Sequence, residues 1–253
     1  MKRFVETERD GLVLRGYLEI PDAAVADGSG DGLSLLVMFH GFTGTLSEKG
    51  FLLSRLSKKV IEGGVATLRF DFLGSGESDG CFSKVTPMTE VNDGLAILRF
   101  AATIPGIDRR RISLLGFSLG GFVAMNVAVR TDIPIEKLVL ISPATRTHEK
   151  MERVLMEEGG ARRGSLVVRE DFIHDGYALD PFVAATQYDG ETLIVQGTDD
   201  QAVPAETAAE YQRFLQCSSV KYVAGADHSY GTPEAFEEMA LHVVQTVCSS
   251  REG

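Results

Sequence analysis

The sequence predicts an α/β protein in which a mostly parallel β-sheet is covered by helices on both faces. Short apolar runs, typical of strands buried on both faces, recur from residue 33 onward. Segments of helix length lie between these runs, and this alternation favours a parallel sheet. A chain of 253 residues, 44% of them hydrophobic, is long enough for one such domain with a sizeable core.

The chain opens with a predicted antiparallel hairpin. Polar and apolar residues alternate in residues 3–9 and 12–20, on either side of Asp10-Gly11. Asp-Gly is a strong hairpin signal because both central positions of the turn need positive φ. Residues 21–32 are rich in Gly and Asp and lack periodicity, which indicates a surface loop.

Further strands and helices are expected to alternate along the rest of the chain. The predicted strands are residues 35–39, 65–70, 112–117, 138–141, 193–195 and 220–223. The predicted helices are residues 47–61, 88–102, 119–130, 204–216 and 233–248. The last helix is the best marked, with Thr232 as its N-cap and Pro233 at its first position.

A long interval interrupts this alternation, between the strands predicted at residues 138–141 and 193–195. It holds too many residues for one crossover helix. Its first part has Met151, Val154 and Leu155 on one helical face and ends at Gly159-Gly160, and the following stretch is expected to be extended or mixed. We therefore predict a core domain of residues 1–142 and 191–253 and an inserted cap subdomain of residues 143–190.

The strongest local motif is Gly116-Phe-Ser118-Leu-Gly120, which lies directly between a predicted strand and a predicted helix. A serine at such a turn has a strained backbone, and the two glycines let strand and helix approach without Cβ clashes. The motif therefore predicts a nucleophilic serine above the carboxyl edge of the sheet. A chance match in a chain with 27 glycines is the alternative, which the flanking strand and helix disfavour.

A serine nucleophile needs a histidine as general base and a carboxylate that orients the histidine. His228 follows the last predicted strand and is the expected base. The four other histidines lie before the elbow, in the cap or in the final helix, where surface, packing or local hydrogen-bonding roles are expected. The acid comes from the loop after the preceding strand, where Asp199 and Asp200 are adjacent; Asp227, next to the histidine, is a less favoured third candidate.

Acyl transfer also needs preorganised hydrogen-bond donors for an oxyanion. Behind such an elbow, one donor is the backbone N–H of the residue after the serine, here Leu119. The second is expected from Phe42, since Gly41 lets the loop after an early strand turn its amides toward the serine. The Phe42 ring is then a pocket wall. Alternatively, His40-Gly41 is only a tight turn that ends a strand.

Other chemistry is not indicated. The Gly74-Ser75-Gly76 segment lacks the remaining glycine of a dinucleotide-binding fingerprint, and no P-loop or metal-binding pair of His or Cys is found, so neither a cofactor nor a metal is expected. The net charge of −11 and a pI of about 5.0 argue against nucleic acid as a partner.

The sequence also carries signals of location. No apolar run approaches the ~20 residues that span a bilayer, and no apolar stretch follows the basic start of the chain. The three cysteines are an odd number without metal-ligand spacing, as is usual in a reducing compartment. We therefore expect a soluble, cytoplasmic protein without a membrane span, and no oligomeric state is predicted.

These motifs together resemble the α/β-hydrolase superfamily over nearly the whole chain. The likeness runs through the hairpin, His40-Gly41-Phe42, the elbow, residues 197–204 and residues 225–230. Residues 40–44, 65–71 and 74–80 are most similar to small bacterial carboxylesterases, which include feruloyl and cinnamoyl esterases, and to monoglyceride-lipase-like hydrolases. One difference is that Phe117 and Leu119 flank the serine where feruloyl esterases tend to have His and Gln.

The resemblance implies an eight-stranded sheet, a cap inserted after the sixth strand and a serine hydrolase. It also implies Asp200 as the acid, from its usual distance to the glycine that ends the strand. We therefore expect Ser118, Asp200 and His228 to hydrolyse small-molecule carboxylic esters, aryl or acyl and including hydroxycinnamoyl esters, through an acyl-enzyme.

The substrate pocket is expected to include Phe42 and the apolar cap stripe of Met151, Val154 and Leu155. Such a pocket would accept an apolar acyl group. The alternative for the stripe is that it only packs the cap onto the core domain. The alternatives for the whole protein are a serine peptidase or amidase of the same fold, for which the sequence reveals no charged anchor, and a non-catalytic binding module.

Overall fold

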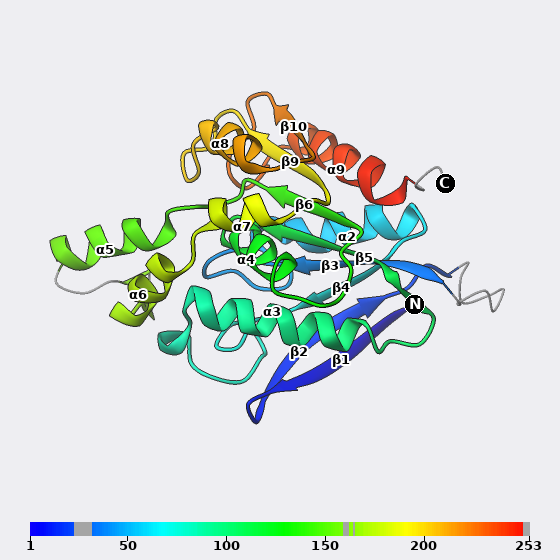
Figure 1. Cartoon of the computed structure of the whole chain (residues 1–253), viewed down its shortest axis with the longest axis horizontal. Coiled ribbons are helices and arrows are strands. Elements are labelled where there is room, and N and C mark those ends of the chain that lie inside the picture. Colours follow the sequence, from blue (N-terminus) through cyan, green and yellow to red (C-terminus); the bar gives the residue numbers. More distant parts are fainter. Residues whose placement is uncertain (23–31, 159–161, 164, 250–253) are drawn as a thin grey trace.

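The computed structural model describes residues 1–22, 32–158, 162–163 and 165–249. The helix end predicted at Gly159-Gly160 lies outside the described residues, as does the predicted surface loop at residues 21–32 except for residues 21, 22 and 32. Figure 1 shows the arrangement of the chain, with a sheet at the centre and helices packed around it.

The predicted hairpin is confirmed. Strands β1 (Lys2–Arg9) and β2 (Leu12–Glu19) pair antiparallel over their full length. Asp10 and Gly11 both have positive φ, 55° and 77°, as a two-residue turn of this kind requires.

Eight strands form one sheet in the order β1-β2-β4-β3-β5-β6-β9-β10. The first two strands are antiparallel to their neighbours, and the other six are parallel to one another. The sheet is therefore eight-stranded and mostly parallel, as predicted. The six parallel strands are β3 (Leu33–Phe39), β4 (Ala66–Phe70), β5 (Ile107–Phe117), β6 (Lys137–Ile141), β9 (Glu191–Gly197) and β10 (Ser218–Val223).

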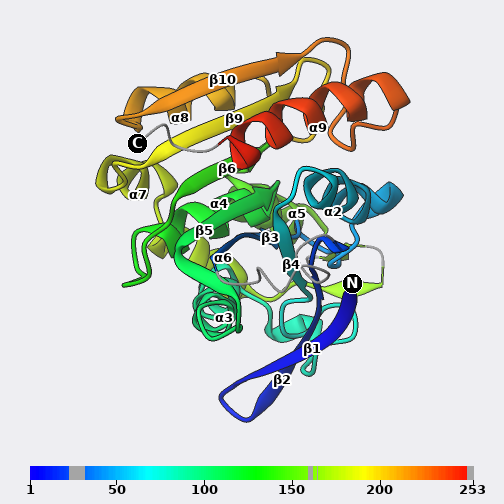
Figure 2. The same ribbon diagram turned by 90° about the vertical axis from the view of Figure 1, so that its right-hand side faces the viewer.

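Helices cover both faces of the sheet (Figure 2). Successive strand residues point to opposite faces, and because both sets are apolar, each face needs a layer of helices to bury it. In β3, Leu36 and Met38 belong to a core with α2 (Leu52–Glu62) and α9 (Pro233–Cys248). The alternate residues of β3 belong to a second core on the other face. That face is covered by α3 (Pro87–Ala101), α4 (Leu119–Ala128), α7 (Pro181–Gln187) and α8 (Glu206–Phe214).

Most predicted bounds shift by at most two residues in the structure, and two elements differ more. Strand β5 begins at Ile107 rather than at residue 112, and its extra residues 109–111 are exposed arginines that carry no apolar signal. The predicted helix at residues 47–61 is split into a 3-10 helix η1 (Lys49–Phe51) and α2. Gly50 and Phe51 have φ of 66° and 58° there, values that no α-helix contains. A second short 3-10 helix, η2, spans Phe82–Lys84.

The segment between β6 and β9 carries three helices and a small hairpin: α5 (Thr147–Glu158), β7 (Arg162–Arg163), β8 (Leu166–Val167), α6 (Glu170–Ala178) and α7. Helix α5 packs on α6, where the rings of His148 and Tyr177 meet edge-to-face with 4.6 Å between their centroids. His148 also lies close to Gly176, where an added Cβ would be 2.2 Å from the His148 Cβ. Helix α7 packs on α8 through Phe182, whose ring centroid lies 5.3 Å from that of Tyr211. The division of the chain into a core domain and a cap at residues 143–190 stays a prediction.

No helix in the described part of the chain is long and apolar enough to cross a membrane.

Candidate active site

The serine of the predicted elbow lies at the turn between β5 and α4. Ser118 has φ 54° and ψ −121°, a strained conformation for a residue with a side chain. A Cβ added at Gly116 would lie 2.0 Å from the Gly120 carbonyl oxygen, and one at Gly120 would lie 2.4 Å from the Phe39 oxygen. Gly116 is therefore needed for β5 to meet α4 at this turn, and Gly120 is needed for α4 to lie against the end of β3.

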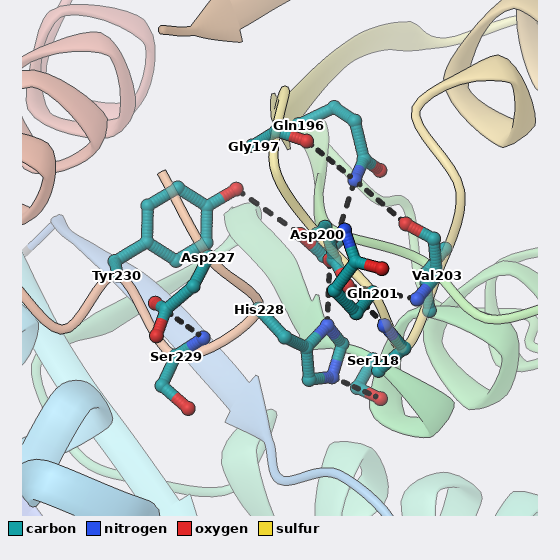
Figure 3. A network of polar contacts seen from close by, with 12 residues as sticks. Ser118, Gln196, Gly197, Asp200, Gln201, Val203, Asp227, His228, Ser229 and Tyr230 are labelled. Atoms are coloured by element: carbon teal, nitrogen blue, oxygen red, sulfur yellow. Dashed lines mark hydrogen bonds and ion pairs between the residues drawn. The ribbon is translucent and has the colours of Figure 1, made fainter. Parts of the chain in front are cut away.

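The structure brings Ser118, His228 and Asp200 together, although they lie far apart in the sequence (Figure 3). They follow the carboxyl ends of β5, β10 and β9, which are parallel and so end at the same edge of the sheet. The Nε2 atom of His228 lies 3.0 Å from Ser118 Oγ, and its Nδ1 atom lies 2.7 Å from Asp200 Oδ2. The order serine, acid, histidine is the order predicted from the motifs.

The carboxyl group of Asp200 is buried and held by its own loop. Its Oδ1 accepts hydrogen bonds from the N–H groups of Ala202 and Val203, each at 2.8 Å, and Oδ2 also accepts one from the side chain of Gln196 at 3.3 Å. Burial alone would raise the pKa of Asp200. The hydrogen bonds from His228, Val203 and Ala202 outweigh that effect and lower the pKa below its ordinary value of 3.8, so the group is ionised at neutral pH.

The two rival acids have other partners. Asp199 is exposed, and its carboxylate accepts a hydrogen bond from the neighbouring hydroxyl of Thr198 at 3.1 Å. Asp227 is also exposed and turns away from the histidine ring (Figure 3), accepting hydrogen bonds from the N–H groups of Ser229 and Gly231. Of the three candidates, Asp200 alone contacts His228 in this structure.

These contacts fix the tautomer of His228. An ionised carboxylate can only accept a hydrogen bond, so Nδ1 must carry the proton that faces Asp200. The Nε2 lone pair is then free to accept the hydroxyl proton of Ser118. The ring of Phe117 lies against the imidazole, with 5.0 Å between the ring centroids, and limits its rotation. The arrangement can activate a serine hydroxyl as a nucleophile.

The loop after β3 lies against Ser118. A Cβ at Gly41 would be 3.0 Å from Ser118 Cβ, closer than ordinary van der Waals contact, so glycine favours this close approach. Among the described residues, neither the Phe42 N–H nor the Leu119 N–H has a hydrogen-bond acceptor. Both predicted oxyanion donors are therefore available to a ligand beside the serine, and their role in binding an oxyanion stays a prediction.

A cavity of about 860 Å³ opens at Ser118 and His228. Phe42, Met151 and Val154 are among its lining residues, and their role in substrate binding stays a prediction. Leu155 is not among its lining residues and packs, partly buried, against the hydrophobic core. The cavity is also lined by residues of the loop after β6, of α5 and of the segment from Gln201 to α8: Ala144, Thr145, Arg146, Thr147, Glu149, Lys150, Arg153, Glu157, Gln201, Ala202, Val203, Pro204, Glu206, Thr207 and Glu210.

The charged part of this lining was not foreseen from the sequence. Helix α5 turns Lys150 and Arg153 toward the cavity beside Met151 and Val154. The apolar periodicity of a helix reveals which residues share a face, but not how far the neighbouring charged residues reach around it. Gln196, which supports Asp200, was also missed; a polar residue inside an apolar strand is the signal that could have identified it.

No group of three or more His, Cys, Asp or Glu side chains within the described residues is arranged to hold a metal ion.

Comparison with known proteins places this architecture among hydrolases. The family model described as serine aminopeptidase, S33 matches residues 33–170, more than half of the chain. The solved structure of Est1E from Butyrivibrio proteoclasticus with bound ferulic acid is similar over 96% of this chain and 97% of that one, with a TM-score of 0.81 and 24% identity. The esterase domain of a Rhodothermus marinus protein matches over 98% of both chains, with a TM-score of 0.74 and 18% identity. At these identities the likeness is one of fold.

Similarity to curated proteins covers shorter segments. An uncharacterized 31.7 kDa protein of the traX-finO intergenic region of Escherichia coli is 37% identical over 87 residues, which are 34% of this chain and 29% of that protein. The thiohydrolase aneE of Aspergillus aculeatus is 32% identical over 120 residues, which are 47% of this chain and 34% of the relative. The chain thus spans about a third of the length of these relatives.

Proposed function

Because this chain belongs to the α/β-hydrolase family described as serine aminopeptidase, S33, we propose that it is a serine carboxylesterase that hydrolyses small-molecule esters through an acyl-enzyme. The observation that carries the proposal is the hydrogen-bond chain from Ser118 Oγ through His228 to the buried carboxylate of Asp200. Such a chain is the arrangement by which serine hydrolases activate their nucleophile.

Acylation uses each of these groups. Ser118 Oγ attacks the ester carbonyl carbon while His228 Nε2 takes the hydroxyl proton. Asp200 stays ionised and stabilises the imidazolium that forms. The carbonyl oxygen becomes an oxyanion, for which the N–H groups of Phe42 and Leu119 are the proposed donors. His228 then returns the proton to the alkoxide, the alcohol leaves, and an acyl ester of Ser118 remains.

Deacylation repeats the sequence with water. His228 Nε2 accepts a proton from the attacking water, and the same two N–H groups hold the second oxyanion. Collapse of this intermediate breaks the bond to Ser118 Oγ, which regains its proton from His228. The products are a carboxylic acid and the free enzyme.

We propose that the enzyme acts in the cytoplasm, in line with its free cysteines at positions 81, 217 and 248.

An aminopeptidase of the same fold is the second candidate, because four glutamates line the cavity. Glu149, Glu157, Glu206 and Glu210 carry carboxylates that could bind the ammonium group of a peptide N-terminus. Arg146 lies 3.8 Å from Glu149 and 4.0 Å from Glu210, however, and offsets these two charges. The ester proposal is therefore favoured, and a peptide substrate would need Glu157 or Glu206 as the anchor of its N-terminus.

Paired substrates separate the two candidates. We expect wild-type protein to hydrolyse p-nitrophenyl butyrate with a higher kcat/KM than leucine p-nitroanilide. Asp200→Asn should lower kcat on the ester by roughly 10²–10⁴-fold, because the wrong tautomer of His228 then faces Ser118. Asp199→Asn is the matched control, one residue away and exposed, and should change kcat less than about twofold. A preference for the anilide would overturn the esterase proposal, and equal losses in the two variants would overturn the role of Asp200.

A further inference from the structure

The peptide group between Gly41 and Phe42 is held from its carbonyl side. The Gly41 carbonyl accepts hydrogen bonds from the His40 ring Nδ1 at 2.9 Å and from the Gly44 N–H at 3.0 Å. The His40 proton must lie on Nδ1, because Nε2 accepts the backbone N–H of Phe72 at 3.1 Å. In a trans peptide the C=O and the following N–H point in opposite directions. Pinning the carbonyl therefore turns the Phe42 N–H away from His40.

Glu48 holds the N–H group of Gly41, the residue whose carbonyl is held by His40 and Gly44. The Gly41 N–H donates to Glu48 Oε1 at 2.6 Å, a charge-assisted hydrogen bond. Oε2 accepts a second backbone hydrogen bond, from the Lys49 N–H at 3.1 Å. With both its N–H and its carbonyl held, Gly41 has little freedom to rotate.

The loop makes specific room for this carboxylate. Glu48 has φ 60° and ψ 166°, a conformation that a residue with a side chain adopts only where its surroundings require it. Its backbone is fixed by hydrogen bonds to Thr45 and Phe51. A Cβ at Gly44 would lie 2.0 Å from Glu48 Oε1, so glycine at position 44 is a condition for the contact.

The contact lies at the site itself. The position of a Gly41 Cβ is 3.3 Å from Glu48 Oε1 and 3.0 Å from Ser118 Cβ. Within the described part of the chain, the half-buried carboxylate of Glu48 forms no ion pair, and its acceptors serve backbone amides of this loop. A surface ion pair therefore does not explain the residue.

We propose that Glu48 is a positioning residue of the oxyanion-binding loop. By accepting the Gly41 N–H, it fixes the Gly41–Phe42 peptide so that the Phe42 N–H faces the oxygen that becomes negative during attack by Ser118. The inference rests on the proposed function. Glu48 itself transfers no proton and touches no substrate.

The test compares Glu48→Ala with Glu48→Gln on p-nitrophenyl butyrate. The alanine variant should lose roughly 10–100-fold in kcat with KM changed less than about threefold, because a misplaced donor weakens transition-state binding rather than ground-state binding. Affinity for a trifluoromethyl ketone, whose adduct carries an oxyanion, should fall by the same factor as kcat/KM. Glu48→Gln keeps an oxygen acceptor and should retain kcat within about threefold.

Two further variants keep the test decisive. Gly44→Ala leaves Glu48 in place but pushes a Cβ against its carboxylate, so it should reproduce the loss in kcat even if Glu48→Ala fails to fold. Asp79→Ala is the control, since Asp79 also accepts a hydrogen bond from a backbone amide, that of Val13 in β2, and forms an ion pair with Arg15 away from Ser118. It should lower the melting temperature and leave kcat unchanged.

The outcomes are distinct. Wild-type kcat in both Glu48→Ala and Gly44→Ala would overturn the positioning role, as would equal losses in the alanine and glutamine variants. A wild-type protein without ester hydrolysis would overturn the proposed function instead.

Discussion

At the scale of single residues, local motifs were more informative than spacing. Ser118 and His228 could be placed from sequence because each follows a recognisable strand, and the elbow has its own glycine signature. Asp199 and Asp200 could not be separated by residue type, since both are aspartates of one loop. The backbone conformation of the loop separates them. The N–H groups of Ala202 and Val203 donate to the carboxylate of Asp200, whereas Asp199 is exposed to solvent.

Residues that support others were harder to identify. Glu48 lies seven positions after Gly41, within a segment that sequence periodicity assigned to a helix. The positive φ values at Thr43 and Glu48 turn the chain so that this side chain reaches back to Gly41, and those at Gly50 and Phe51 delay the start of α2. Such contacts depend on loop conformation, for which apolar periodicity carries no signal.

A buried carboxyl group in α3 does not belong to the site. Glu90 is fully enclosed, its Oε2 has no hydrogen-bond partner within the described residues, and Asp93 adds a like charge nearby. Burial, followed by the repulsion from Asp93, raises the pKa of Glu90 well above its ordinary value of 4.5. Between these two values the native state binds more protons than the unfolded state, so stability falls as the pH rises.

Glu90→Gln should therefore stabilise the protein at high pH. We expect the free energy of unfolding at pH 8 to rise by about 1–3 kcal/mol, because an amide removes the buried charge and keeps the shape. At pH 4, below the ordinary pKa of Glu90, the gain should largely vanish. Urea unfolding at the two pH values measures this, with exposed Glu238→Gln as the control. A loss of stability that is equal at both pH values would contradict it.

At the scale of elements, the apolar periodicity predicted helix α5 but not which of its residues line the cavity. Its apolar stripe divides in the structure: Met151 and Val154 line the cavity, whereas Leu155 packs against the core. Both interpretations of the stripe, pocket wall and packing surface, therefore apply to different residues. A pocket with flexible and apolar walls is expected to discriminate weakly, so rates should vary gradually with acyl length.

Substitutions in α5 should separate these two roles. Val154→Ala should change the dependence of kcat/KM on acyl length, lowering it for butyrate and longer esters by about 10-fold, because apolar contacts to the acyl chain are lost. Leu155→Ala should keep the profile and lower the free energy of unfolding by about 1–3 kcal/mol, as expected for a partly buried leucine. Kinetics on esters of increasing length and thermal unfolding check both. An altered profile in Leu155→Ala alone would contradict this assignment.

At the scale of the whole molecule, the fold class was predictable because many weak signals agree. Alternating buried strands and helices recur from β3 to α9, and this order favours a parallel sheet covered by helices. The spatial order of the strands was not predictable in the same way. Strand β4 lies between β2 and β3, and only tertiary packing reveals that placement.

The fold brings together four loops from one edge of the sheet, and the central claim is that they form a serine hydrolase site. The alternative of a non-catalytic binding module makes the opposite prediction for covalent chemistry at Ser118. A fluorophosphonate reports on this directly, because it phosphonylates only an activated serine hydroxyl.

The most direct measurement is therefore mass spectrometry of the protein after reaction with a fluorophosphonate. We expect one adduct per chain, located on the peptide that contains Ser118, no adduct in Ser118→Ala, and labelling slowed by several orders of magnitude in His228→Ala. An unlabelled wild-type protein, or an adduct that persists in Ser118→Ala at the wild-type rate, would contradict it.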